Sequence, residues 1–205
     1  MTFVKICGVM SVEDARVCVE AGADAIGLNF APSSPRCVTR EVAAAIVASL
    51  PGHVLSVGVF VDADYAELVD TQRQVGLGCL QLHGSEAPEL LARCLPHAYK
   101  AIRVQGAASI DEAARYPGDH ILLDAYVPGV AGGTGHTFDW ELAARIARAR
   151  KLTLAGGLRP ENVAAAIAAV QPYCVDVASG VEAGVGKKDP ARVRAFVENA
   201  KAAAV

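Results

Sequence analysis

A lysine and a cysteine lie two positions apart in the first apolar stretch of the chain, FVKIC at residues 3–7. Successive side chains of a β-strand point to opposite faces, so Lys5 and Cys7 share one face of this strand. A cysteine acts as a base or nucleophile in its thiolate form, which a neighbouring positive charge favours. Taken alone, the pair also fits an edge strand with a solvated lysine and a small buried thiol. The remainder of the chain decides between these interpretations.

Two glycine-rich stretches later in the chain have the composition of a phosphate site. Gly156 and Gly157 follow the apolar run of LAGGL, and Ser179 and Gly180 follow that of VASGVE. Glycine lets backbone N–H groups approach phosphate oxygens closely, and a serine hydroxyl adds a donor. Either stretch alone would also serve simply to turn a strand into a helix. The two together favour phosphate binding.

Elements that position these residues follow a regular order. Short runs rich in β-branched residues alternate with longer segments of helical pattern rich in alanine. The first helix is expected to begin at Ser11, with Asp14 at the capping-box position, and to end at Gly22, and the second to begin at Thr39. Because a helix separates each pair of strands, the strands are expected to be parallel. The eight predicted strands are residues 3–7, 24–30, 54–61, 78–83, 98–104, 120–124, 152–157 and 174–179.

We therefore predict an α/β protein with a single domain, residues 1–205, folded as a (β/α)8 TIM barrel. An open doubly wound sheet is the alternative, but Gly8 alone follows the first strand, where a dinucleotide-binding sheet needs a glycine fingerprint. A barrel carries its active site at the C-terminal ends of its strands. Those ends hold Cys7, Asn29, Asp62, His83, Arg103, Asp124, Gly156, Gly157, Ser179 and Gly180.

The composition favours a globular protein with a small-molecule partner. The chain is 53% hydrophobic and 20% charged with a net charge of −3, which predicts no nucleic-acid partner. We see neither an apolar run long enough to span a bilayer nor a signal-peptide pattern, so a cytoplasmic protein without a membrane partner is expected. The six cysteines never approach C-x-x-C spacing, so we expect no metal site.

The chain resembles the phosphoribosylanthranilate isomerases of tryptophan biosynthesis. The set of matching stretches is specific, although one of them alone would be weak. The resemblance implies an aldose–ketose type isomerase without a cofactor, which performs an Amadori rearrangement of N-(5-phosphoribosyl)anthranilate to 1-(o-carboxyphenylamino)-1-deoxyribulose 5-phosphate. The matching stretches are KICG (5–8), SPR (34–36), LQLHG (80–84), LLDA (122–125), GGTGHTFDW (132–140), LAGGL (154–158), VDVASGVE (175–182) and GKKD (186–189).

The resemblance assigns the general base to Cys7 and the general acid to Asp124. The acid protonates the ribose ring oxygen so that the ring opens, and the base then removes the proton from the adjacent carbon. Arg36 is expected to hold the anthranilate carboxylate, because a planar guanidinium can bind a carboxylate bidentately. His83 is expected to contact the substrate, and the two glycine-rich stretches are expected to hold its phosphate.

Residues 125–137 follow Asp124 and are rich in glycine. A segment of this length in a compact barrel is typical of a mobile lid or binding loop. His136 stands where the family's loop often has lysine, and Ala178 stands where a second serine is common. Trp140, at the start of the next helix, is expected to anchor that helix by packing.

A closed barrel would place the last strand beside the first, and so Asp176 beside Lys5. A buried ammonium group needs a partner, because unpaired burial is costly. We therefore predict a Lys5–Asp176 ion pair inside the barrel that supports the Cys7 thiolate. In the alternative, Lys5 faces outward and reaches water between the helices.

Other functions stay open at this point. A histidine-pathway phosphoribosyl isomerase shares the fold and the rearrangement, but it resembles a duplicated half-barrel with aspartates as acid and base, which Cys7 argues against. A Schiff-base aldolase would use a strand lysine such as Lys5 or Lys100. A non-catalytic barrel that binds a sugar phosphate is the alternative outside enzymes. We expect a monomer acting on a small phosphorylated molecule, with a homodimer left open.

Overall fold

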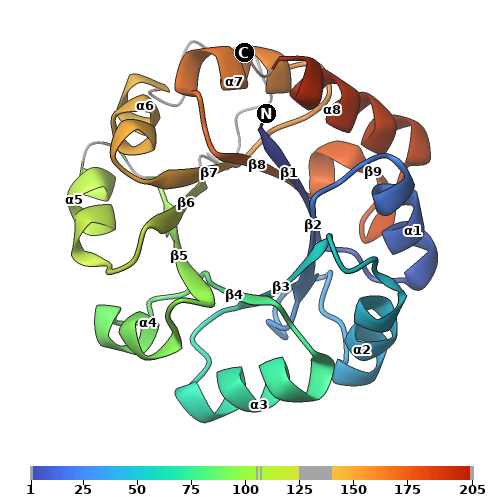
Figure 1. Cartoon of the computed structure of the whole chain (residues 1–205), viewed down its shortest axis with the longest axis horizontal. Coiled ribbons are helices and arrows are strands. Elements are labelled where there is room, and N and C mark those ends of the chain that lie inside the picture. Colours follow the sequence, from blue (N-terminus) through green and yellow to red (C-terminus); the bar gives the residue numbers. More distant parts are fainter. Residues whose placement is uncertain (1, 105, 107, 125–139, 204–205) are drawn as a thin grey trace.

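Eight parallel strands close into a barrel in the order β1 to β8, with β8 pairing back onto β1. This computed structural model describes residues 2–104, 106, 108–124 and 140–203. Figure 1 looks along the barrel and shows the helices as a ring outside the strands. The fold is the predicted (β/α)8 barrel. The strands are β1 (Phe3–Cys7), β2 (Ala25–Asn29), β3 (Leu55–Phe60), β4 (Cys79–Leu82), β5 (Ala98–Arg103), β6 (His120–Asp124), β7 (Lys151–Ala155) and β8 (Cys174–Val177).

The helices begin where side chains cap their first turns. The Ser11 hydroxyl accepts the N–H of Asp14 at 3.1 Å, and the Thr39 hydroxyl accepts that of Val42 at 3.3 Å, as predicted for the first two helices. Gly22 follows the first helix with a φ of +91°, a conformation that favours glycine. The helices are α1 (Val12–Glu20), α2 (Arg40–Ser49), α3 (Tyr65–Val75), α4 (Pro88–Cys94), α5 (Ala108–Arg115), α6 (Trp140–Ala149), α7 (Val163–Val170) and α8 (Pro190–Ala202).

Strand boundaries agree closely with those predicted. β1 and β6 have the predicted bounds, and the other strands differ by one or two residues at one or both ends. The prediction for β8 was too long, because the strand ends at Val177 and the chain turns into a 3₁₀ helix, η1 (Ser179–Val181). A two-stranded hairpin of β9 (Glu182–Gly184) and β10 (Lys187–Lys188) then connects η1 to α8.

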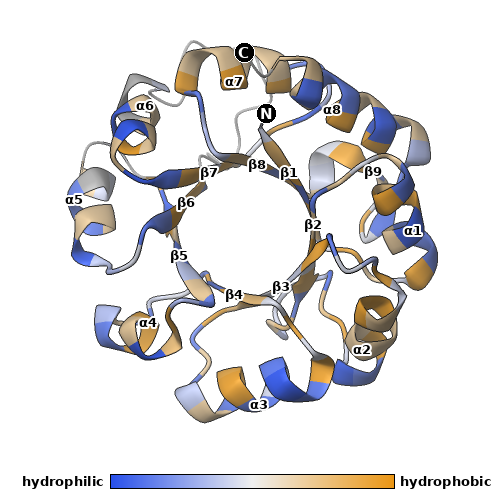
Figure 2. Ribbon diagram, viewed as in Figure 1, coloured by the Kyte–Doolittle hydropathy of each residue, from blue (hydrophilic) through white to orange (hydrophobic). Residues whose placement is uncertain are grey.

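Apolar residues fill two regions of the molecule. The larger region lies between barrel and helices and includes Ile6 and Ile26, while a smaller one lies inside the barrel around Val57 and Leu122. Figure 2 shows many of the hydrophilic residues on the surrounding helices, for example on α3 and α8. Trp140 is partly buried and packs against the larger region, as expected.

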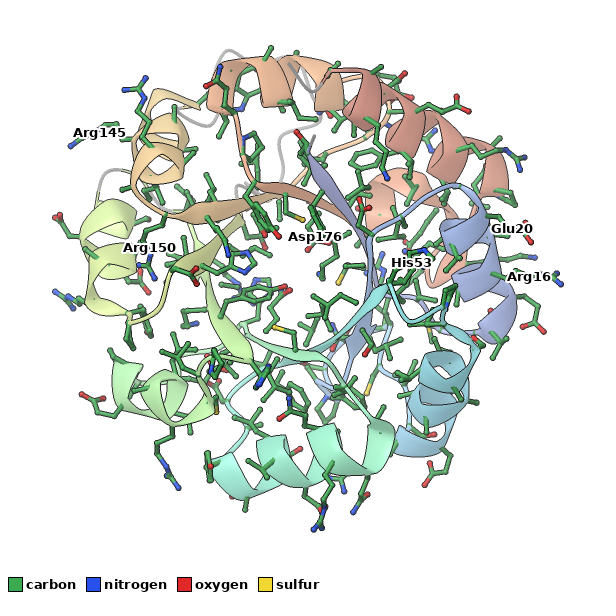
Figure 3. The ribbon with its side chains drawn as sticks, viewed as in Figure 1. Arg16, Glu20, His53, Arg145, Arg150 and Asp176 are labelled. Carbon is green, nitrogen blue, oxygen red and sulfur yellow. The ribbon has the colours of Figure 1, made fainter. Side chains whose placement is uncertain are left out.

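The barrel interior also holds buried polar side chains. Lys5, Gln81, Thr153 and Asp176 are each at most 6% exposed. In Figure 3 Asp176 lies within the ring of strands, whereas Arg16, Glu20 and Arg145 project at the outer rim. Buried polar groups must be paired to avoid a large desolvation cost, so this interior is where specific polar contacts are expected.

The part of the chain that the structure describes contains no helix with the length and apolar character needed to cross a bilayer.

Candidate active site

A cavity of about 240 Å³ opens at the C-terminal ends of the strands. It brings together the predicted catalytic, carboxylate-binding and phosphate-binding residues, and Asp176 also contributes to its wall. A neighbouring depression of about 270 Å³ contains Asp62 and Arg103 from the predicted ring of strand ends, and it shares His83 with the main cavity. Predicted site residues that line the main cavity are Cys7, Arg36, His83, Asp124, Gly156, Gly157, Asp176, Ser179 and Gly180.

Lys5 and Asp176 form the ion pair predicted from the sequence. The Nζ atom of Lys5 donates to Oδ2 of Asp176 at 2.8 Å, and the lysine side chain is 2% exposed. Burial works to lower the pKa of Lys5, but the charges of Asp176 and of an ionised Cys7 raise it well above its usual value. Lys5 therefore stays protonated. Oδ1 of Asp176 is buried and has no hydrogen-bond partner among the described residues.

Burial and the neighbouring charges act in opposite directions on the pKa of the Cys7 thiol. Burial raises its pKa, and this is the largest effect, while the ammonium of Lys5 lowers it. Asp176 raises the pKa further and Lys188 lowers it, with a net increase above the usual value. The thiol form is therefore favoured by these surroundings, and the two lysines keep the pKa lower than burial alone would set it.

Gly27 of β2 makes room for these two side chains. It pairs in register with Cys7, and a Cβ atom at this position would lie 2.7 Å from the Cys7 sulfur and 3.1 Å from Nζ of Lys5. Contacts this short require the neighbours to move. Sequence reasoning missed Gly27, because the short run AIGLN shows nothing of what approaches it from the next strand.

Arg36 reaches the cavity in a fixed orientation. Its Nε donates to Oε1 of Glu182 at 2.7 Å and one terminal nitrogen donates to Oε2 at 2.6 Å, a bidentate pair. Burial is the largest single effect on Glu182 and raises its pKa, but the hydrogen bonds from Arg36 and the charge of Lys188 together outweigh it and lower the pKa below its usual value. Gly8 supports the arrangement, because it has a φ of +68° and a Cβ atom there would collide with the Arg36 side chain.

Lys188 connects this pair to the end of β1. Its fully buried ammonium donates to Glu182 at 3.0 Å, to the carbonyl of Cys7 at 2.7 Å and to the carbonyl of Ala178 at 3.2 Å. Glu182 and Lys188 both fall within the stretches VDVASGVE and GKKD, so the signal was present in the sequence. Their roles were missed, because Arg36 and Glu182 lie 146 positions apart.

His83 is close to the predicted acid. Its Nε2 lies 3.3 Å from Oδ2 of Asp124. On the other side of the ring, Nδ1 is 3.0 Å from Nε2 of Gln81, and the Gln81 carbonyl oxygen accepts the hydroxyl of Tyr99 at 2.9 Å. Gln81 and Tyr99 are almost fully buried. Sequence reasoning had not singled out either residue.

The two glycine-rich loops meet at one side of the cavity. Gly156 and Gly157 have φ values of +92° and +65°. At Gly180 a Cβ atom would collide with the carbonyl oxygen of Leu158, so glycine is required for this close approach of the loops after β7 and β8. Arg192 of α8 donates to the Gly180 carbonyl at 3.0 Å. Both loops line the cavity.

Residues 125–137, predicted to form a lid, and His136 within them lie outside the described residues. Among the residues that are described, no group of three or more His, Cys, Asp or Glu side chains is placed to hold a metal ion.

A (β/α)8 barrel whose mouth combines a thiol, a carboxylate and paired glycine loops belongs to the class of barrel enzymes, whose active sites lie at the C-terminal ends of the strands. The family model for N-(5'phosphoribosyl)anthranilate (PRA) isomerase matches residues 4–199. The chain belongs to this family and is an isomerase of tryptophan biosynthesis.

Relatives of known name match over nearly the whole chain. N-(5'-phosphoribosyl)anthranilate isomerases of Geobacter sulfurreducens and Pelobacter propionicus are 49% and 46% identical over 201 residues, 98% of this chain and 99% and 96% of theirs. The crystal structure of phosphoribosyl anthranilate isomerase from Thermotoga maritima superimposes with a TM-score of 0.90 at 43% identity, over 98% of this chain and 100% of that one. Another structure of the enzyme, in complex with reduced 1-(o-carboxyphenylamino)-1-deoxyribulose 5-phosphate, has a TM-score of 0.87 at 41% identity over the same shares.

Proposed function

We propose that the cavity rearranges N-(5-phosphoribosyl)anthranilate with Asp124 as general acid and Cys7 as general base. The observation that carries this proposal is that both side chains line one cavity together with the two glycine loops. They project from β6 and β1, which are separated by β7 and β8 around the barrel. A substrate whose phosphate lies at the loops after β7 and β8 would have one of these groups on each side of its sugar.

The reaction then proceeds in two proton transfers. Asp124 gives its proton to the ribose ring oxygen as the bond from that oxygen to the anomeric carbon breaks, which leaves an iminium ion. The Cys7 thiolate takes the proton from the adjacent carbon, and the electron pair of that bond forms an enolamine. The enolamine tautomerises to the ketone product. The charge of Lys5 favours the thiolate that this second step needs.

Arg36 is proposed to bind the anthranilate carboxylate. Glu182 holds one edge of its guanidinium, so the edge formed by the two terminal nitrogens is presented in a defined direction. A bidentate carboxylate contact requires such an edge. We propose further that Oδ1 of Asp176, buried in the cavity wall without a described partner, accepts a hydroxyl of the ribosyl group.

The phosphate is assigned to the loops that contain Gly156, Gly157, Ser179 and Gly180. Crystals grown in sulfate or phosphate should hold an anion at these loops. An anion found elsewhere, with these loops empty, would count against the assignment.

A Schiff-base aldolase is disfavoured by the state of the two candidate lysines. Lys5 is paired with Asp176, and Lys100 lies 3.1 Å from Glu86 and donates to three backbone carbonyls. A Schiff base requires a neutral amine, which such pairing opposes. Neither lysine lines the cavity. The histidine-pathway reaction is disfavoured because β1 ends in Cys7.

The function is tested by supplying anthranilate, phosphoribosyl pyrophosphate and the transferase that joins them, and following the loss of anthranilate-type fluorescence. Cys7→Ala and Asp124→Asn should each lower kcat by about 10²–10⁴-fold. Cys79→Ala, which removes another thiol from the barrel interior, should keep near-normal turnover. Near-normal turnover of both active-site variants would refute the assigned mechanism. An inactive parent would instead support a non-catalytic barrel.

We infer in addition that residues 1–205 form one domain that works in the cytoplasm as a monomer. The Thermotoga maritima relative has been described as dimeric, in a structure of monomers generated from it. Light scattering of this chain across a concentration series distinguishes the two states, since a dimer would give twice the mass.

A further inference from the structure

A line of polar side chains runs from Tyr99, inside the barrel near Lys5, along the cavity wall to Asp124. Tyr99 of β5 donates its hydroxyl to Gln81 of β4 at 2.9 Å, and the Gln81 amide nitrogen lies 3.0 Å from Nδ1 of His83. The other ring nitrogen of His83 lies 3.3 Å from Oδ2 of Asp124. The mechanism above uses neither Gln81 nor Tyr99, although an amide buried on an apolar strand is costly unless both of its groups are paired.

Lys5 sets the direction of hydrogen bonding at one end of this line. Burial raises the pKa of Tyr99 well above its usual value, so the phenol keeps its proton, and the positive charge of Lys5 acts on the Tyr99 oxygen. A nearby cation attracts the phenol oxygen and turns the hydroxyl hydrogen away, here toward Gln81. The Gln81 carbonyl oxygen accepts that hydrogen, which leaves the amide N–H₂ group facing His83.

The imidazole of His83 must then accept at Nδ1. A neutral imidazole that accepts at one nitrogen carries its hydrogen on the other, so Nε2 is the protonated nitrogen. Nε2 is the atom that faces Asp124, and a carboxylate oxygen favours a facing N–H. The Gln81 end of the line therefore requires this tautomer, and a carboxylate at the Asp124 end favours it.

We propose that Gln81 and Tyr99 are positioning residues that hold His83 in its Nε2–H form, so that the proton of Asp124 stays available to the substrate. This inference rests on the proposed role of Asp124 as general acid. With Oδ2 accepting from His83, the acidic proton is carried on Oδ1. In the opposite tautomer, the Nε2 lone pair would accept the proton from the Asp124 carboxyl group, giving an imidazolium–carboxylate pair in which the proton is held by His83 and Asp124 can no longer donate it to the sugar.

The tautomer can be measured without reference to activity. Protein labelled with ¹⁵N in its five histidines is studied by multiple-bond ¹H–¹⁵N correlation at mildly alkaline pH, where a free imidazole is neutral. His83 is assigned from the signals lost in His83→Asn. We expect Nδ1 to show the shift of an unprotonated nitrogen and Nε2 that of a protonated one.

Three variants change the line at defined points. Gln81→Glu places a carboxylate against Nδ1 and should add a proton there, while Gln81→Met should give a mixture of the two neutral tautomers. Tyr99→Phe removes the hydroxyl that orients the amide and should have the same effect as Gln81→Met in smaller degree. Because the general acid is lost only in the part of the population that has the other tautomer, Gln81→Met should lower kcat severalfold and leave KM nearly unchanged.

Tyr116→Phe is the matched control, because it removes a phenol that donates to the Glu86 carbonyl at 2.8 Å outside this line. It should change neither the His83 signals nor kcat. The spectra also report whether each variant is folded. The proposal is overturned if Nδ1 is protonated in the parent, if Gln81→Glu leaves Nδ1 unprotonated, or if Gln81→Met reduces kcat no more than the control. Normal turnover by Asp124→Asn would instead refute the acid assignment, and the catalytic role of the line with it, whatever the tautomer.

Discussion

The ammonium of Lys5 and the carboxylate of Asp176 lie 2.8 Å apart in neighbouring strands, inside the barrel and next to Cys7. The pair connects the first and the last strand of the barrel, β1 and β8, and its side chains lie inside the barrel beside the Cys7 thiol. Lys5 lowers the pKa of Cys7 and Asp176 raises it, so the net field depends on both partners. The ion pair therefore links the stability of the barrel to the chemistry at its mouth.

Replacing Lys5 by methionine should raise the pKa of Cys7, which burial already places above its usual value. The lysine is the larger of the two cationic influences that oppose this burial effect, so its removal leaves the thiolate less favourable. The pKa is measured from the pH dependence of thiolate ultraviolet absorbance, after subtraction of the Cys7→Ser titration. Lys151→Met, a change at an exposed lysine, should leave the value unaltered. An unaltered value in Lys5→Met would mean that this lysine serves the fold alone.

The same substitution should lower the free energy of unfolding by roughly 3–5 kcal/mol, because it leaves Asp176 buried without its partner. Lys5→Met combined with Asp176→Leu removes both charges and should recover much of this loss. Urea unfolding of the parent and of the single and double variants provides the comparison. A double variant less stable than Lys5→Met would show that the unpaired charge is not the source of the loss.

The ion pair was predictable because barrel closure and strand alternation together specify it. Once β1 and β8 are neighbours, Lys5 and Asp176 fall in register, and a buried ammonium has few alternatives. The positions of Cys7 and Asp124 at the mouth follow from the same alternation. Element order and strand alternation together sufficed to place this part of the site.

Contacts made by loops were beyond prediction from the sequence. The pairing of Arg36 with Glu182 depends on how the turn after β8 folds back over the end of β1, and the predicted end of β8 was wrong at that point. Gly27 is important only because the side chains of Lys5 and Cys7 approach it from β1. The importance of such residues depends on tertiary packing, which the local periodicity of the sequence does not reveal.

Arg36→Ala should raise KM about 10–100-fold and change kcat much less, because the carboxylate it is proposed to hold does not react. A hydrogen bond to a charged group contributes about 1.5–3 kcal/mol, which corresponds to this range. The parent should discriminate strongly against a substrate analogue that lacks the carboxylate, and the variant should not. Arg16→Ala, on an exposed helix face, serves as the control. Equal discrimination by parent and variant would assign the carboxylate to another residue.

Gly27→Ala should reduce kcat with a smaller effect on KM. The added methyl group would lie 2.7 Å from the Cys7 sulfur, so the thiol must move, and a displacement of about 1 Å in a reacting group can cost about 10²-fold. Gly52→Ala is the control, because nothing lies within 4 Å of a Cβ atom there. Steady-state kinetics and a crystal structure of Gly27→Ala check both halves of the argument. An undisplaced sulfur, or unchanged kcat, would contradict it.

Acidification should destabilise the barrel through His120, which is stacked on Tyr99 and lies 2.8 Å from the Thr153 hydroxyl. Burial lowers the pKa of His120 from 6.5 to about 4. Between these values the unfolded chain binds a proton that the folded chain does not, so the free energy of unfolding falls as the pH decreases from 6.5 to 4. A difference of 2.5 pKa units limits this loss to about 3 kcal/mol.

Urea unfolding across this range should show a smaller pH dependence in His120→Gln than in the parent, whereas His53→Gln, at an exposed position, should match the parent. If His120→Gln keeps the full pH dependence of the parent, carboxylates rather than this imidazole cause the loss.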